Sequence, residues 1–331
     1  MSKLFLLGRA PNSQGNTQSS KPDWAQADPR DIDQALTRAL SKPSGGWVVV
    51  DATRAIQKSP SKYTIHGREL VAWWCKKKGN EGSRVAPDYC PHMGAELSKG
   101  HVDPEGRIVC PWHALALSGE TPRGAFVPLK TYDDGLLTWV RIPELVRQGE
   151  PLTEKPNLPL RPRQYVDGVI RMEAQCEPRD VIANRLDPWH GAHFHPHSFA
   201  NLRIIDRGDD YITVRVVYRI AFKLGMEVDA RFDCPDPRTI VMTVISGEGV
   251  GSIVETHATP TRDGYTAITE ATLGTTERAG VIAWLPKVAG KLIRPLVEDR
   301  AKKLWVEDAD YCERLYSLRK KADASRDQTK K

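Results

Sequence analysis

Two short stretches that combine cysteine and histidine decide the fold of the first half of the chain. They are Cys90-Pro91-His92 and, seventeen residues later, Cys110-Pro111-Trp112-His113. A structural zinc site also takes two Cys and two His, but it usually draws the two Cys from one element and the two His from another. One Cys and one His on each stretch favour instead a two-iron cluster, in which one iron binds both thiolates and the other binds both imidazoles.

The residues around these ligands resemble the two ligand loops of Rieske iron–sulfur proteins. The stretches concerned are Cys90-Pro-His-Met-Gly-Ala-Glu-Leu-Ser-Lys-Gly and Cys110-Pro-Trp-His. The resemblance runs from about Trp47 to Ile142. It implies a small antiparallel-β domain that holds a 2Fe-2S cluster on Cys90, His92, Cys110 and His113. The chain departs from the family at Ala114-Leu115-Ala116-Leu117, where Gly-Trp-x-Phe is common, which leaves the ligands intact but affects local packing and cluster potential.

A second group of histidines lies in the other half of the chain, in Asn184-Arg-Leu-Asp187-Pro-Trp-His190-Gly-Ala-His193-Phe-His195-Pro-His197. Four of the nine histidines fall within eight residues of this stretch. On a continuous helix His190 and His195 would point about 140° apart, so they can face one ion only if the helix breaks. Gly191 permits a break, and Pro196 disfavours helical geometry at His195.

The same stretch fits the N-x2-D-x2-H-x4-H pattern of Rieske non-haem iron oxygenases. The resemblance implies that His190 and His195 bind a mononuclear iron, with His193 as the alternative to His195, and that Asp187 is a bridging carboxylate. His193 and His197 are otherwise expected to be outer or surface residues. In that family the third ligand is an Asp on a C-terminal helix. The stretch Glu307-Asp308-Ala-Asp-Tyr-Cys-Glu313 matches its E-D-x4-E pattern, which selects Asp308, with Asp310 as the alternative.

Two histidines and one carboxylate on one face of Fe(II) leave neighbouring positions open for dioxygen and substrate. The resemblance therefore implies a terminal oxygenase that carries out monooxygenation, by hydroxylation or oxidative demethylation, of a hydrophobic substrate such as a steroid, terpenoid or carotenoid-like molecule. It also implies a homotrimer in which electrons cross between subunits. No G-x-G-x-x-G follows a strand, so a separate reductase or ferredoxin is expected to supply electrons. The alternative is a Rieske electron-transfer protein without oxygenase activity.

The chain is expected to be an α+β protein, with an antiparallel-β Rieske domain followed by a helix-grip catalytic domain. A helix is predicted over residues 31–40, and five prolines between Ile142 and Tyr165 mark a linker. Strand-like segments after the linker predict a large antiparallel sheet, which helices over 281–296 and 298–318 would cover. The predicted divisions are an N-terminal arm and short helix (1–44), the Rieske domain (45–144), the linker (145–163), the catalytic domain (164–318) and a basic flexible tail (319–331).

The composition of the 331 residues excludes several classes of protein. The net charge is +6, but residues 317–331 contribute +4 of it, so the rest of the chain is nearly neutral and nucleic-acid binding is not expected. Six cysteines without a secretory signal suggest thiols or metal ligands rather than disulfides. No apolar run approaches the roughly 18 residues of a membrane span. A cytoplasmic protein that is not integral to a membrane is expected.

Overall fold

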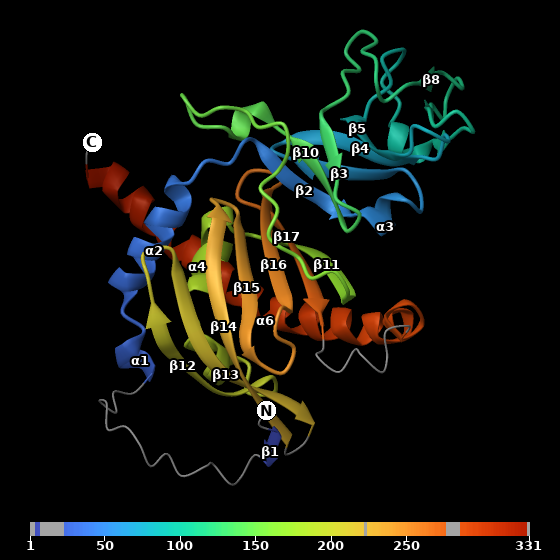
Figure 1. Ribbon diagram of the computed structural model, residues 1–331. Helices are drawn as coiled ribbons and strands as arrows, with labels where there is room; N and C mark the ends of the chain where they lie inside the picture. The colour runs from blue at the N-terminus through green and yellow to red at the C-terminus, as the bar shows by residue number, and fades with distance from the viewer. Residues whose placement is uncertain (1–3, 7–22, 222–223, 276–284, 330–331) are drawn as a thin grey trace.

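Three small antiparallel sheets build the first domain in the computed structural model, which describes residues 4–6, 23–221, 224–275 and 285–329 (Figure 1). His66 and Gly67 form the turn between β3 (Ser61–Ile65) and β4 (Arg68–Cys75), with φ angles of 50° and 72°, as two-residue hairpin turns require. In pairing order the sheets are β2 (Trp47–Ala52), β10 (Leu137–Arg141) and β9 (Thr131–Asp133); β3 (Ser61–Ile65), β4 (Arg68–Cys75) and β5 (Gly82–Pro87); and β6 (His101–Val102), β7 (Ile108–Val109) and β8 (Ala116–Leu117).

One antiparallel sheet forms the second domain and confirms the predicted α+β architecture. Its main path runs β11 (Val166–Ala174), β17 (Thr266–Gly274), β16 (Ile253–Pro260), β15 (Thr239–Gly247), β14 (Leu224–Asp236), β13 (Tyr211–Ala221) and β12 (Phe199–Arg207). Two strands of this sheet were not predicted from the sequence: β12, and β1 (Leu4–Leu6), which pairs with β14. Most of the predicted N-terminal arm lies outside the described residues.

Successive residues of these strands face opposite sides of the sheet, so each strand serves two environments. In β16, Val254 and Thr256 line a cavity, whereas Glu255 and His257 contact residues of the linker and of the first domain. The sheet therefore separates the cavity on one face from the first domain on the other.

Helices cover the cavity face of the sheet. α2 (Pro29–Ser41) begins after Asp28, whose side chain accepts a hydrogen bond from the Arg30 backbone N–H at 2.9 Å, and it packs on α4 (Pro178–Leu186). The long helix α6 (Leu285–Thr329) packs against β11 and α4. Within the described ranges, no helix is both long and apolar enough to cross a membrane.

The helices predicted over 281–296 and 298–318 are one helix from Leu285 onward, with Pro295 inside it; residues 281–284 lie outside the described part of the chain. A proline in a helix interior removes one backbone hydrogen bond at a cost of about 3 kcal/mol. Contacts on both sides of the proline offset this cost. Arg294 pairs with Asp167 at 2.6 Å, and Trp305 is fully buried.

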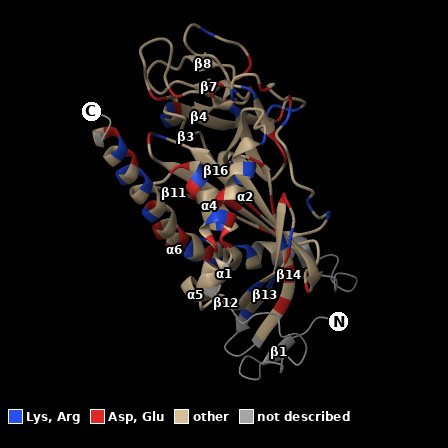
Figure 2. Cartoon of the chain, turned by 90° about the vertical axis from the view of Figure 1, so that its left-hand side faces the viewer, with Lys and Arg blue, Asp and Glu red and all other residues tan. Residues whose placement is uncertain are grey.

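The prediction of a flexible tail over 319–331 is wrong for residues 319–329, because α6 continues to Thr329. Arg319 donates hydrogen bonds to Asp180 at 2.8 Å and to Glu177 at 2.9 Å, which ties this end of α6 to the start of α4. Figure 2 shows Lys and Arg interspersed with Asp and Glu along this part of the helix. The segment is polar because much of its surface faces solvent, and it is helical because its residues favour helix and are anchored at Arg319.

A shared apolar core joins the two domains. Its members from the first domain are Trp47, Val49, Ala52, Leu136, Leu137 and Trp139, and those from the second are Val169, Val241, Ile253, Ala271 and Leu273. Hydrogen bonds cross the same boundary: Thr259 Oγ1 donates to the Val49 carbonyl at 2.8 Å, and Arg171 Nε donates to the Val50 carbonyl at 3.1 Å.

Arg161, in the segment between the domains, makes the buried ion pairs at this boundary. Its guanidinium binds both carboxylate oxygens of Glu255, at 2.5 and 2.7 Å, and lies 2.9 Å from Asp134 of the first domain. The side chains of Arg161, Glu255 and Asp134 are 13%, 0% and 3% exposed, respectively. Burial opposes ionisation of Glu255, but the hydrogen bonds from Arg161 and His257 prevail and hold its pKa below the ordinary value.

Candidate metal centres

Two loops of nearly identical backbone geometry carry the Cys and His residues of the first domain. In the loop after β5, the Cys90 N–H donates to the Ala95 carbonyl and the Gly94 N–H donates to the Cys90 carbonyl, both at 2.8 Å. In the loop between β7 and β8, the Cys110 N–H donates to the Leu115 carbonyl at 2.9 Å and the Ala114 N–H donates to the Cys110 carbonyl at 3.1 Å.

Gly94 and Ala114 hold equivalent positions in these loops, with φ angles of 77° and 55°. A left-handed conformation costs a residue other than glycine about 1 kcal/mol. The departure at Ala114, where glycine is common in the resembling family, therefore introduces local strain next to His113 without changing the hydrogen bonds of the loop.

The loops place two thiols inside the domain and two imidazoles at its surface. Cys90 and Cys110 are 2% and 3% exposed, and both belong to one buried apolar cluster. The rings of His92 and His113 are exposed, with their centroids 4.8 Å apart. Paired buried thiols and paired exposed imidazoles fit a two-iron cluster whose histidine-bound iron faces outward.

The second group of candidate ligands depends on where two helices end. α4 begins with Pro178 and a capping box between Glu177 and Asp180, and it stops at Leu186 because Pro188 follows the next residue. A short helix, α5 (His190–Phe194), comes next.

His195 follows α5 with φ −118° and ψ 55°, outside helical geometry, while its N–H still donates to the Gly191 carbonyl at 3.1 Å. This break is the one that the sequence required. It allows the imidazoles of His190 and His195 to face the same point.

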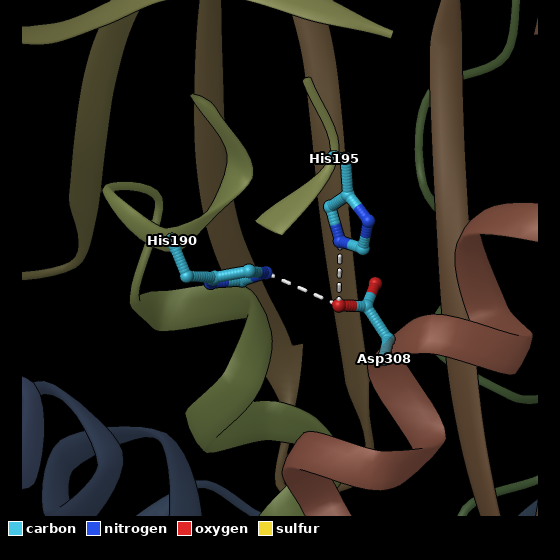
Figure 3. A group of neighbouring side chains, drawn as sticks. All are labelled: His190, His195 and Asp308. Carbon is cyan, nitrogen blue, oxygen red and sulfur yellow. Dashed lines mark hydrogen bonds and ion pairs between the residues drawn. The ribbon is translucent and has the colours of Figure 1, made fainter. Parts of the chain in front are cut away.

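That point is the carboxylate of Asp308 on α6 (Figure 3). Asp308 Oδ1 lies 3.1 Å from His190 Nε2 and 2.9 Å from His195 Nε2. One potential ligand atom from each of the three residues lies within 4.8 Å of the others. His190 Nδ1 donates a hydrogen bond to the Asp187 carbonyl, so Nε2 is the ring nitrogen that faces Asp308 and can bind a metal in place of its proton.

The electrostatics of the group favour an ionised carboxylate. Burial opposes ionisation of Asp308, but hydrogen bonds from His190 and His195 and the positive charge of Arg185 hold its pKa far below the ordinary value. Burial likewise opposes protonation of His195, and its hydrogen bonds to Asp308 and Glu307 outweigh this and raise its pKa. The ionised Asp308 carboxylate can therefore bind a metal cation in place of the protons that His190 and His195 direct at it.

Unpaired polar atoms border the group. Asp187 Oδ2 accepts a hydrogen bond from Tyr311 Oη at 3.1 Å and lies 3.8 Å from His190 Nδ1, while Asp187 Oδ1 is buried without a partner among the described residues. Asn184 Nδ2 donates to Asp308 at 3.1 Å, and Asn184 Oδ1 is likewise buried and unpaired in the described part of the chain. Buried polar atoms without partners are rare, so they favour a site that is completed by another group.

The alternatives considered from the sequence lie outside this group. His193 and His197 are exposed, and Asp310 is exposed on α6, whereas Asp308 is 1% exposed. Glu307 was quoted from the sequence only as part of a pattern, yet its Oε2 lies 2.6 Å from His195 Nδ1. Its position beside Asp308 was the only signal, and the sequence could not show which side chain it would reach.

A cavity of about 280 Å³ lies against His190, His195 and Asp308. Its wall is largely aliphatic and aromatic, and includes Phe199, Leu202, Val214, Phe232, Ile240 and Met242. A few polar side chains interrupt this wall, among them Arg185, Thr256 and Glu270. An apolar cavity with few polar groups is typical of a site for a small organic molecule.

Comparisons with known proteins agree with this arrangement. Residues 46–131 match the family model of the Rieske 2Fe-2S domain, and residues 147–323 match a family described as a domain of unknown function, DUF5914. Aminopyrrolnitrin oxygenase PrnD of Pseudomonas fluorescens is 33% identical over 76 residues, which cover 23% of this chain and 20% of that protein. The vanillate O-demethylase oxygenase subunit of Pseudomonas sp. (strain HR199 / DSM 7063) is 35% identical over 80 residues, which cover 24% of this chain and 21% of that protein.

The matched segments of these two curated relatives thus span about a fifth of each relative's length. The likeness in fold is broader. The crystal structure of dicamba monooxygenase bound to dicamba aligns with a TM-score of 0.61 at 16% identity, covering 85% of this chain and 90% of that one. The chain therefore belongs to the DUF5914 family and is a Rieske-type protein with the fold of the Rieske non-haem iron oxygenases.

Proposed function

We propose that this chain is the terminal oxygenase component of a Rieske non-haem iron oxygenase and carries out monooxygenation, by hydroxylation or oxidative demethylation, of a hydrophobic organic substrate. The convergence of His190, His195 and Asp308 beside an apolar cavity carries the proposal. The alternative is a Rieske electron-transfer protein. It has no evident use for an open two-histidine, one-carboxylate site, so the same observation weighs against it.

In this proposal Cys90, His92, Cys110 and His113 hold the 2Fe-2S cluster, and His190, His195 and Asp308 hold Fe(II). When bound, the cluster supplies electrons and the mononuclear iron activates dioxygen. The protein orients the ligands: the Asp187 carbonyl fixes the tautomer of His190, and Glu307 orients the ring of His195. The apolar cavity wall excludes water from the reacting part of the substrate.

We further propose that Asp187 connects the iron site to a cluster histidine of another subunit within a homotrimer. Support comes from Asp187 Oδ1, which is buried and unpaired among the described residues, and from the exposed imidazoles of His92 and His113. Figure 2 also places β8, which follows the second cluster loop, far from α5, which begins with His190. A separate reductase or ferredoxin delivers the electrons.

Glu307→Ala is expected to weaken Fe(II) binding by about tenfold to a hundredfold, because His195 loses the carboxylate that orients it. Glu307→Gln keeps a hydrogen-bond acceptor and is expected to lose less. Anaerobic equilibrium dialysis against Fe(II) measures the change. Asp310→Ala, an exposed acid on the same helix, is the matched control; loss of iron in that variant but not in Glu307→Ala would contradict the assignment.

Replacing His92 or His113 with alanine tests the cluster half of the proposal. Each replacement removes one of the two imidazoles, so the visible absorption of the purified protein is expected to disappear. His101→Ala, an exposed histidine of the same domain, is expected to leave the spectrum unchanged. An unaltered spectrum in the His92 and His113 variants would refute these ligands, and a colourless protein that contains zinc would indicate a structural zinc site instead.

A further inference from the structure

Arg185 on α4, Thr256 on β16 and Glu270 on β17 form a polar cluster within the apolar wall of the cavity. Glu270 is 4% exposed and accepts hydrogen bonds from Trp305 Nε1, at 2.6 Å, and from the Arg185 guanidinium. The guanidinium carbon of Arg185 lies 4.8 Å from the centre of the Trp305 ring. The ion pair and the ring contact hold Arg185 in one orientation.

The Arg185 guanidinium has hydrogen-bond donors that the described residues do not use. Nε donates to Thr256 Oγ1 at 3.4 Å and Nη2 donates to Glu270, whereas Nη1 donates to no described residue. The side chain lines the cavity and is 21% exposed. A guanidinium offers five N–H donors, and an unmet donor facing an apolar cavity favours a ligand that brings an acceptor.

Glu270 determines which kind of acceptor fits. Its carboxylate already compensates the charge of Arg185, so the pair presents donors to the cavity but little net positive charge. An anionic group bound to Arg185 would lose its hydration without gaining an unpaired cation at that position, since the other arginine of the lining, Arg300, is an exposed residue of α6. A ketone, ether or hydroxyl oxygen accepts the same hydrogen bonds at a much smaller desolvation cost.

The cluster lies close to the proposed iron ligands. Trp305 precedes Asp308 by three residues on α6, and Arg185 and Asp308 line the same cavity. An acceptor bound to Arg185 therefore lies near the reacting end of the cavity, while the rest of the molecule contacts the apolar wall.

We propose that Arg185 is a specificity-determining residue that binds the substrate, and that the substrate is an apolar molecule with an uncharged oxygen acceptor near the carbon that reacts. This inference rests on the proposed function, because that function makes the cavity the substrate site. Glu270 and Trp305 act as positioning residues for the guanidinium.

Equilibrium dialysis of the full chain against three probes of similar size tests the proposal: tetralin, which has no acceptor, α-tetralone, which has a neutral acceptor, and α-naphthoate, which is anionic. In Arg185→Met, affinity for α-tetralone is expected to fall by about tenfold or more, while affinity for tetralin changes by less than about twofold. The wild type is expected to bind α-naphthoate less tightly than α-tetralone.

Two further variants keep the test decisive. Arg185→Met combined with Glu270→Gln removes both charges, so it guards against misfolding caused by an unpaired buried carboxylate, and it should lose the same selectivity. Arg203→Met is the matched control, because Arg203 is an exposed arginine beside the cavity residue Leu202 on β12 and should change no affinity.

Three results would overturn the proposal. The first is that Arg185→Met loses affinity for tetralin and α-tetralone equally. The others are that the wild type binds α-naphthoate most tightly of the three probes, or that it shows no measurable binding of α-tetralone up to its solubility limit. Fe(II) content measured on the same samples separates this inference from the proposed function. A protein that discriminates the probes through Arg185 yet binds no iron would refute the oxygenase and leave the role of Arg185 standing.

Discussion

Asp187→Ala is expected to keep the cluster and the mononuclear iron while turnover falls by about a hundredfold. Asp187 is not one of the three converging residues, and the tautomer of His190 depends on the Asp187 backbone carbonyl, which alanine retains. The variant removes the Asp187 carboxylate. One oxygen of this carboxylate accepts a hydrogen bond from Tyr311, and the other has no partner among the described residues. The variant should therefore still bind iron, but electron transfer along the proposed route should be lost.

Iron content, the visible spectrum and the rate at which dioxygen reoxidises the reduced cluster in the presence of substrate measure this result. Tyr311→Phe is an informative companion, because it removes only the hydrogen bond to Asp187 and should cost less than Asp187→Ala. Normal turnover in Asp187→Ala would show that electrons reach the iron by another route. Loss of iron would show that the side chain has a ligand or folding role.

Arg161→Ala is expected to lower the free energy of unfolding by about 3–5 kcal/mol at neutral pH, because it leaves buried carboxylates without their cation. Glu255 is fully buried and Asp134 is 3% exposed, and both bind Arg161. Chemical denaturation measures the change. Arg68→Ala, which breaks an exposed ion pair with Glu144, is the control and should cost about 1 kcal/mol or less.

The pH dependence of this loss provides a second check. Burial raises and Arg161 lowers the pKa of both Asp134 and Glu255, with a net result below the ordinary values. Their pairing therefore stabilises the fold above the pKa of the unfolded carboxyls and is lost as the pH falls through the folded pKa. The difference between wild type and Arg161→Ala should shrink in acid. A difference independent of pH would mean that lost packing, not charge, explains the effect.

The cluster loops could be predicted from the sequence because their geometry is local. Each loop places its Cys and His within four residues, and hydrogen bonds within the loop fix their orientation. The break at His195 was also predictable, because Pro196 follows it directly and Gly191 lies four residues before it. Asp308 was selected only through a family resemblance, because nothing local relates it to histidines more than a hundred residues earlier.

Other features depend on tertiary contacts that the sequence pattern does not reveal. Val306 and Leu318 of α6 are 54% and 45% exposed, while the small residues Ala301 and Ala309 lie on its buried face. Glu270 is an acidic residue in a strand. Its contact with Arg185 could be predicted only by knowing which face of the sheet Glu270 occupies and where α4 packs. The end of α6 is polar enough to suggest a solvated tail until the contact of Arg319 with Asp180 is known.

Anaerobic iron and sulfide analysis, combined with a visible spectrum, tests most directly the claim that two metal centres share this chain. Three irons and two sulfides per chain are expected, of which two irons and both sulfides belong to the 2Fe-2S cluster. His190→Ala combined with His195→Ala should lower the count to two irons and leave the colour unchanged. Three irons in the double variant, or a wild type that holds only two irons even after Fe(II) is added, would contradict it.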